Sequence, residues 1–190
     1  MSRHTPFAAS TALVCAVLLW ASACTAPPPP TQDAGTAVVV GIVDGDTADL
    51  DLAGRRERVR LLGIDTPETD HPSRPVECYG AEATARLSEL IPPGTALRVE
   101  RDIEARDHFD RLLLYLYRAS DDLFVNLEMV SSGHATTLHV EPNGAHRSAL
   151  AAAQAEARAQ GRGLWAACGG PGMAVDPLQP RPPVLPGAAP

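Results

Sequence analysis

The segment from Arg60 to Thr69 places a cationic side chain close to two acidic ones. Its sequence is Arg-Leu-Leu-Gly-Ile-Asp-Thr-Pro-Glu-Thr, so Asp65 and Glu68 follow Arg60 closely. The planar fork of an arginine suits a phosphate, carboxylate and carbonyl oxygens suit a hard cation such as Ca²⁺ or Mg²⁺, and a carboxylate can deprotonate water. Taken alone, these acids are more typical of a solvated turn than of a site, so the rest of the chain has to decide between the two interpretations.

The elements before this segment are predicted to bring another carboxylate close to it. Alternating and β-branched residues predict a meander of three strands, at Val38–Val43, Thr47–Leu52 and Arg56–Ile64. Asp44-Gly45 is a strong hairpin signal between the first two strands. Asp46 follows this turn and would face Asp65 across a short gap, although alone it is more typical of a turn acid. Two carboxylates that close need a cation between them, unless one is protonated.

A second arginine stands at the entrance of a later strand. Arg111 follows a charged loop at Asp102–Asp110 and precedes the apolar run Leu112–Tyr117. One interpretation makes it a strand-end cation that pairs with Asp107 and Asp110. The other makes it a second phosphate clamp, because phosphoryl chemistry depends on positioning and on charge stabilisation.

The remaining elements complete one mixed domain. Helices are predicted where apolar residues recur with helical spacing, at Tyr79–Ile91, Asn126–Ser132 and about Ala145–Gln160, with a further strand at Thr95–Arg101 and an extended piece at Thr136–Val140. Gly133 and Gly161 are predicted to end the second and third helices, and Asn143 to cap the start of the third. The fold class is therefore α+β.

Composition limits the kind of protein further. A chain of 190 residues favours a single domain with a real core. All 16 basic residues are arginine and the formal net charge is −7, which argues against a broadly basic nucleic-acid coat. A local basic site remains compatible with this charge.

The N-terminus has the pattern of an export signal. Arg3 and His4 precede an apolar run from Ala12 to Trp20 that is too short for a membrane span. Ala21-Ser22-Ala23 fits an ordinary secretory cleavage site, and the same residues followed by Cys24 are similar to a bacterial lipoprotein box. We therefore expect a signal peptide over residues 1–23 and an exported protein, with Cys24 a candidate lipidation site. Free secretion and a lipid anchor in the membrane both stay open.

Proline content and cysteines set the expected boundaries. Residues 24–36 are predicted to form a proline-rich tether, 37–168 the folded domain, and 169–190 a disordered proline-rich tail. Cys78 and Cys168 are the pair left inside an exported domain, so a disulfide is expected between them.

Five ordered blocks resemble the staphylococcal nuclease (thermonuclease) family. They are Val43-Asp44-Gly45-Asp46-Thr47, the decapeptide Arg60–Thr69, Tyr79-Gly80-x-Glu82-Ala83, Asp107-His108-Phe109-Asp110-Arg111 and Gly163-Leu164-Trp165. The resemblance covers about 125 residues, and it implies a five-stranded OB-fold barrel with three helices.

The resemblance also implies a function and a role for each site residue. The family activity is Ca²⁺-dependent hydrolysis of phosphodiester bonds in DNA and RNA, leaving 3′-phosphate ends. By motif, Asp46, Asp65 and the Thr66 carbonyl hold Ca²⁺, Glu68 is the general base, and Arg60 and Arg111 bind the scissile phosphate. The alternative is a catalytically weak or inactive OB-fold module that binds nucleic acid or protein in the cell envelope. Nothing in the sequence indicates more than a monomer.

Some positions depart from the family pattern. Asp110 stands where the family usually has glycine, and His108 stands where it has lysine. The region after Gly133 lacks the tyrosines that stack on the nucleotide in the family, and has His139 and Glu141 there.

Overall fold

Five long strands form a closed barrel in the computed structural model, which describes Met1 and residues 32–69 and 75–175. The strands are β1 (Gln32–Ile42), β2 (Thr47–Leu52), β3 (Arg55–Leu61), β5 (Ala96–Arg101) and β6 (Leu112–Arg118). They are hydrogen-bonded in the order β3-β2-β1-β5-β6, and the short β7 (Leu123–Phe124) extends the sheet beyond β6. The expected α+β fold with a five-stranded OB-fold barrel is confirmed.

A parallel pairing of β3 with β6 closes the barrel. Val59 lies opposite Leu112, and Arg60 lies opposite Leu113. The other barrel pairs are antiparallel. Because β6 begins directly after Arg111, this closure brings Arg60 and Arg111 to one edge of the barrel although they are far apart in sequence.

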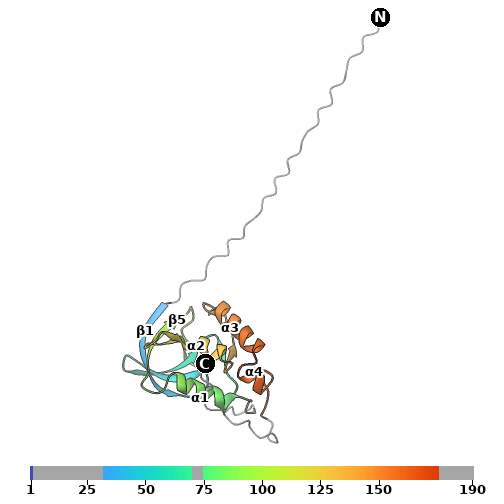
Figure 1. Ribbon diagram of the computed structural model, residues 1–190. Helices are drawn as coiled ribbons and strands as arrows, with labels where there is room; N and C mark the ends of the chain where they lie inside the picture. Colours follow the sequence, from blue (N-terminus) through green and yellow to red (C-terminus); the bar gives the residue numbers. More distant parts are fainter. Residues whose placement is uncertain (2–31, 70–74, 176–190) are drawn as a thin grey trace.

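Helices pack around the barrel (Figure 1). The predicted ones are α1 (Gly80–Leu90), α2 (Val125–Ser131) and α3 (Arg147–Ala159), and a short α4 (Leu164–Ala167) follows them. Gly133 and Gly161 end α2 and α3 with positive φ angles of 75° and 62°, as expected. No helix in the described ranges has the length and apolar content that a membrane span requires.

The predicted third strand is interrupted at Gly63. Its φ of 76° turns the chain, and a Cβ there would lie 2.5 Å from Leu150 Cδ1, so the site needs glycine. The chain continues as β4 (Ile64–Asp65), which pairs with β8 (Thr136–Thr137) outside the barrel. This separate small sheet carries Asp65 away from the barrel wall.

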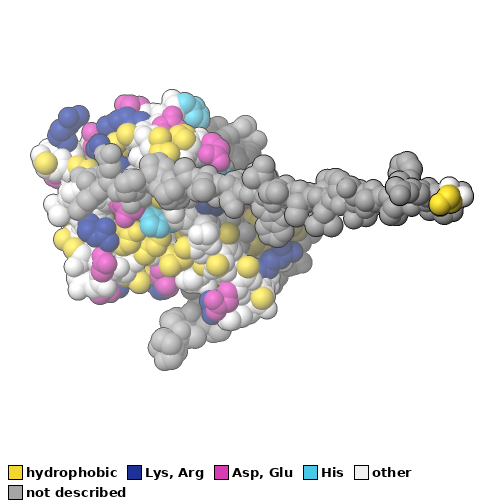
Figure 2. Space-filling view, turned by 90° about the horizontal axis from the view of Figure 1, so that it is seen from above, with side chains coloured by type: hydrophobic (Ala, Val, Ile, Leu, Met, Phe, Trp, Pro, Cys, Tyr) yellow, Lys and Arg dark blue, Asp and Glu magenta, His cyan; other side chains and the backbone are white. Residues whose placement is uncertain are grey.

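Alternation along the strands separates a core face from an outer face. Val59 and Leu61 of β3 and Ala48 and Leu50 of β2 are buried in the core. The residues that alternate with them, including Arg58 and Arg60 of β3, therefore lie on the outer face. Figure 2 shows acidic and basic side chains intermixed over the face in view, without a broad field of one sign, as the net charge suggested.

Both ends of the domain extend beyond the expected boundaries. We expected a tether up to residue 36, but β1 begins at Gln32 and pairs with β5 as far as Arg101. At the other end, Ala174 forms a bridge with Glu77 inside the expected tail. Backbone pairing needs no apolar side chains, which is why composition missed both. The signal peptide, Cys24 and the rest of the tether and tail lie outside the described residues.

The predicted disulfide joins Cys78 to Cys168. The Cα atoms are 6.0 Å apart, and the bond links the segment before α1 to the end of α4. The Cys78 amide also donates to the Met173 carbonyl at 2.7 Å. The chain at Cys78 is thus fastened to the C-terminal end of the domain.

Candidate active site

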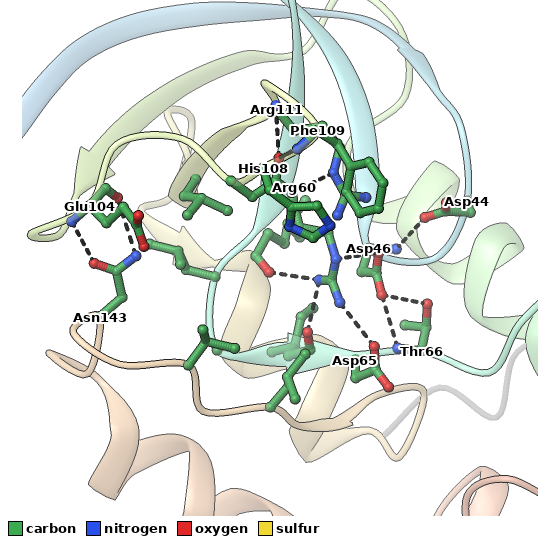
Figure 3. A pocket seen from close by; sticks show the side chains of 18 of the residues that line it. Asp44, Asp46, Arg60, Asp65, Thr66, Glu104, His108, Phe109, Arg111 and Asn143 are labelled. Atoms are coloured by element: carbon green, nitrogen blue, oxygen red, sulfur yellow. Dashed lines mark hydrogen bonds and ion pairs between the residues drawn. The ribbon is translucent and has the colours of Figure 1, made fainter.

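A cavity of about 640 Å³ lies at the edge where β3 and β6 meet. Its lining includes every side chain that the sequence singled out for catalysis or metal binding: Asp46, Arg60, Asp65, Thr66, Glu68 and Arg111. Figure 3 shows Arg60 at the centre of this group, with Asp46, Asp65 and Thr66 on one side and the loop of His108 to Arg111 above. Residues from the start, middle and later part of the domain therefore share one site.

The cation between the two expected carboxylates is Arg60. Its Nε lies 3.1 Å from Asp46 Oδ1, and its Nη2 lies 3.0 Å from Asp65 Oδ1. Nη1 donates to the carbonyls of Leu61 and Ile64 at 2.9 and 2.8 Å. The side chain is only 12% exposed, so the guanidinium is held at the floor of the cavity in one orientation.

Asp46 is buried and oriented by Thr66. Its Oδ2 accepts from the Thr66 amide and from Thr66 Oγ1, both at 3.0 Å. A Cβ on Gly45 would lie 2.8 Å from Thr66 Oγ1, which explains the glycine in this turn. The hairpin tip and the segment after β4 are thus locked together, and Asp65 beside them is the more exposed acid, at 55%.

Glu68 lines the cavity from a loop whose two ends meet. Its carbonyl accepts from the Glu77 amide at 2.8 Å, and Glu77 Oε2 accepts from the Glu68 amide at 3.2 Å. Glu77 also lines the cavity, and sequence reasoning did not single it out. Since Cys78 follows directly, the disulfide fixes the base of this loop.

Arg111 is held by Asp107. Its Nε donates to Asp107 Oδ2 at 2.7 Å, and its amide donates to Asp107 Oδ1 at 3.0 Å. Burial raises the pKa of Asp107, but the hydrogen bonds and charge of Arg111 outweigh this, so the net pKa is lowered. Both interpretations of Arg111 therefore hold geometrically: it pairs with an acid and also lines the cavity.

Asp110 adopts a backbone conformation that favours glycine. Its φ is 64°, and aspartate tolerates this region better than most residues. Its carboxylate is 89% exposed and lies 3.6 Å from Arg106 Nη1. The departure from the family glycine is thus accommodated by the loop.

Asn143 fastens the same loop and does not cap a helix. Its Oδ1 accepts from the Glu104 amide at 2.7 Å, and its Nδ2 donates to the Glu104 carbonyl at 3.2 Å. The N-cap of α3 is His146, so the predicted cap was wrong. An asparagine side chain satisfies any suitably placed peptide group, and sequence cannot tell a distant partner from a local one.

A buried asparagine positions the strand that leads into the site. Asn126 is fully buried, donates to the Leu62 carbonyl at 2.9 Å and accepts from the Leu116 amide at 2.9 Å. It therefore joins the end of β3 to β6. Its position in the first turn of α2 gave no sequence signal, apart from being a polar residue in an apolar run.

The rim of the cavity is partly apolar. Phe109 is 68% exposed, and its ring centroid lies 3.8 Å from that of His108. Leu138 and Val140 line the same cavity and are 42% and 58% exposed. His139 Nε2 lies 2.7 Å from Glu141 Oε1 nearby.

The acidic side chains at the cavity are of the kind that binds an oxygen-ligated cation, but only a few of them lie close together. In the described residues no group of three or more His, Cys, Asp or Glu side chains is arranged to hold a metal. Asp46, Asp65 and the Thr66 carbonyl would supply only oxygen atoms, which Ca²⁺ accepts together with water. Burial and the neighbouring Asp46 raise the pKa of Asp44, which also lines the cavity. The case for Ca²⁺ therefore rests on the oxygen donors that these residues offer.

Comparisons with known proteins agree with this architecture. A model of the Staphylococcal nuclease homologue family matches residues 58–167. The chain is 35% identical to Thermonuclease of Staphylococcus intermedius over 128 residues, which are 67% of this chain and 74% of the relative. It is 34% identical to Endonuclease YncB of Bacillus subtilis (strain 168) over 129 residues, which are 67% of this chain and 60% of that protein. With its barrel, its site and these matches, the chain belongs to the staphylococcal nuclease family.

Proposed function

We propose that this protein is an exported, Ca²⁺-dependent endonuclease that hydrolyses phosphodiester bonds of DNA and RNA. The relatives named thermonuclease and endonuclease support a nuclease. The main support for Ca²⁺-dependent hydrolysis is that one cavity is lined by both arginines, by Glu68 and by the acids Asp46 and Asp65. A pure binding module has no need for this combination.

The arginines bind the scissile phosphate and stabilise the charge that builds up on it. Arg60 is oriented by Asp46 and Asp65, and Arg111 by Asp107. Fixed guanidinium groups lose little freedom when a phosphate arrives, so their electrostatic effect on the transition state is larger. Asp107 is in this sense a positioning residue for Arg111.

Glu68 accepts the proton of the attacking water. The oxygen of that water forms a bond to phosphorus and the bond from phosphorus to the 5′ oxygen breaks. The 5′ oxygen takes a proton from solvent, Glu68 releases its proton to solvent, and a 3′-phosphate and a 5′-hydroxyl result. Ca²⁺ held by Asp46, Asp65 and the Thr66 carbonyl would neutralise phosphate charge and polarise bound water.

Export is supported by the disulfide as well as by the N-terminal pattern. Disulfides persist in oxidising compartments and are rare in a reducing cytosol, and Cys78 is bonded to Cys168. Mass spectrometry of the protein from its native cells tests this. A mature N-terminus at Cys24 carrying lipid would identify a lipoprotein, cleavage there without lipid would identify free secretion, and an intact residue 1 would contradict export.

The test of activity is digestion of single-stranded DNA and RNA by the purified protein, in Ca²⁺ and in chelator, beside Glu68→Gln. Loss of the base is expected to lower kcat by about 10²–10⁴-fold while Ca²⁺ and nucleotide binding persist. Cleavage that both chelator and substitution abolish supports the proposal. A folded protein that binds DNA without cleaving it in any buffer would favour the binding module.

A further inference from the structure

A row of arginines continues outward from the site along β3. Arg56, Arg58 and Arg60 alternate with Glu57 and the core residue Val59. They therefore point from the same outer face of the strand, about 6.6–6.8 Å apart at each step. This step is similar to the separation of successive phosphates in an extended single strand of nucleic acid.

A single buried carboxylate holds the two outer arginines in place. Asp49 lies opposite Arg58 in the β2–β3 register. Its Oδ1 accepts from Arg58 Nε at 2.9 Å, and its Oδ2 accepts from Arg56 Nη2 at 2.7 Å. The hydrogen bond from Arg58 is the main reason why the pKa of Asp49 is lowered, so Asp49 stays charged.

The arginines cover this acid and present their own charge to solvent. The Asp49 side chain is 9% exposed, whereas those of Arg56 and Arg58 are 66% and 55% exposed. Two guanidinium groups on one carboxylate leave a net positive charge. A purely structural ion pair would need only one of them.

Three other acids lie near the row, and each accepts a hydrogen bond from a group other than Arg56 or Arg58. Asp46 contacts Arg60 and Thr66 within the cavity. Asp51, opposite Arg56, accepts from the Gly54 amide at 2.6 Å. Asp44, which also acts electrostatically on Arg58, accepts from the Asp46 amide.

We propose that Arg56 and Arg58 form a track for backbone phosphates of a single-stranded polynucleotide, continuing the line that begins at Arg60. The track rests on the proposed nuclease function and extends it from one phosphate to a longer substrate. It is independent of base sequence, because the contacts are to phosphates. Arginine suits this task, since its fork can bind a phosphate oxygen while another N–H holds Asp49.

Variants on the two faces of the same strand test the track. Arg56→Gln, Arg58→Gln and the double variant remove it, and Arg55→Gln is the matched control. Arg55 is 80% exposed, sits on the opposite face and pairs with Glu57. Thermal unfolding of all four confirms that each is folded before comparison.

The substrates are a thymidine dinucleotide and a thymidine dodecamer, cleaved in Ca²⁺. The double variant is expected to lose about tenfold or more in kcat/KM on the dodecamer, and little on the dinucleotide, which has a single phosphodiester. The salt dependence of dodecamer binding is expected to weaken by about 0.7 in slope for each lost phosphate contact. Equal losses on both substrates, or losses matched by Arg55→Gln, would overturn the track.

The experiments distinguish a protein that is not a nuclease from a nuclease that does not use Arg56 and Arg58 to bind phosphates. If the wild-type protein cleaves neither substrate, the proposed function fails. Fluorescence anisotropy of the labelled dodecamer in chelator then still tests the track. Weaker binding by the double variant than by Arg55→Gln supports it, and identical binding contradicts it.

Discussion

At the scale of single residues, Arg60 and Arg111 differ in how the protein holds them. Arg60 contacts two carboxylates and two carbonyls and is 12% exposed, whereas Arg111 is 27% exposed and its side chain contacts Asp107. Arg60 is thus a structural cross-link as well as a candidate phosphate ligand. The two arginines are expected to respond differently to the same substitution.

Arg60→Lys is expected to lower both stability and activity. A lysine cannot reproduce the fork that satisfies Asp46 and the carbonyls, so the free energy of unfolding should fall by about 1–3 kcal/mol. Arg111→Lys is the control, with a loss of activity and a stability change below about 0.5 kcal/mol. Urea denaturation and initial cleavage rates of both variants measure this, and equal destabilisation would argue against the cross-link.

Asp110→Gly is expected to stabilise the loop that carries Arg111. Its φ of 64° is strained for a residue with a Cβ, so glycine should raise the stability by about 0.5–1 kcal/mol. Asp110→Asn removes the charge and keeps the conformational preference. A stability gain with glycine alone assigns the effect to the backbone, whereas the same gain with asparagine would assign it to charge.

At the scale of elements, Asn126 reinforces the junction of β3 and β6, the two strands at which the site lies. Removing its side chain leaves the Leu62 carbonyl and the Leu116 amide without a partner in the core. Asn126→Ala is therefore expected to lower the free energy of unfolding by about 1–3 kcal/mol. Asn143→Ala serves for comparison, with a smaller stability loss and a larger relative loss of activity, because it frees the loop of Arg111. Denaturation and cleavage assays measure the losses of stability and of activity in both variants. A larger stability loss in Asn143→Ala than in Asn126→Ala would contradict these assignments.

Burial of His134 after α2 predicts a loss of stability in mild acid. Burial, and then the charge of Arg86, lower its pKa to about 4, so the folded protein favours the neutral ring. Between pH of about 6.5 and about 4 the unfolded chain binds the proton more readily, and stability falls by about 1–3 kcal/mol over that window. Below it the loss from this group is complete. His134→Leu should flatten the profile there in urea titrations at successive pH values, and an unchanged slope would exclude this histidine as the cause.

The sequence predicted the helices and strands that have a side-chain pattern. It missed the segments that are held only by backbone hydrogen bonds. The alternation in β2 and β3, the apolar spacing in α1 and the glycines after α2 and α3 all have local signals. Residues 32–36 and 173–175 pair through peptide groups with β5 and with the segment before Cys78, and no residue pattern marks such pairing.

The same limit applies to the site. Motifs identified Asp46, Arg60, Asp65, Thr66, Glu68 and Arg111, and the structure places all of them at one cavity. The sequence could not indicate that Arg60 lies between the acids, or that Glu77 and Asn143 fasten the site loops. Those contacts depend on the path of the whole chain in space, which brings Glu77 back to Glu68 and Asn143 to Glu104.

At the scale of the whole molecule, the disulfide secures both the fold and the Glu68 loop. It closes a span with a sequence separation of 90, and removing such a bond typically costs about 2–5 kcal/mol of stability. Cys78→Ser with Cys168→Ser is expected to show that loss in denaturation. The double variant is also expected to lose more in kcat than in its affinity for an oligonucleotide measured without Ca²⁺. The reason is that the disulfide no longer holds the base of the loop that carries Glu68. An unchanged kcat in a folded double variant would show that the disulfide does not help to position Glu68.

The order of synthesis gives this bond a further consequence. A ribosome releases Cys78 long before Cys168, so the Glu68 loop cannot be fastened until nearly the whole domain has emerged. Oxidation is also required, which a reducing cytosol opposes. The chain therefore leaves the ribosome with the loop unsecured. Under the export proposed above, the loop would be secured only on the far side of the membrane, away from the cell's own nucleic acids.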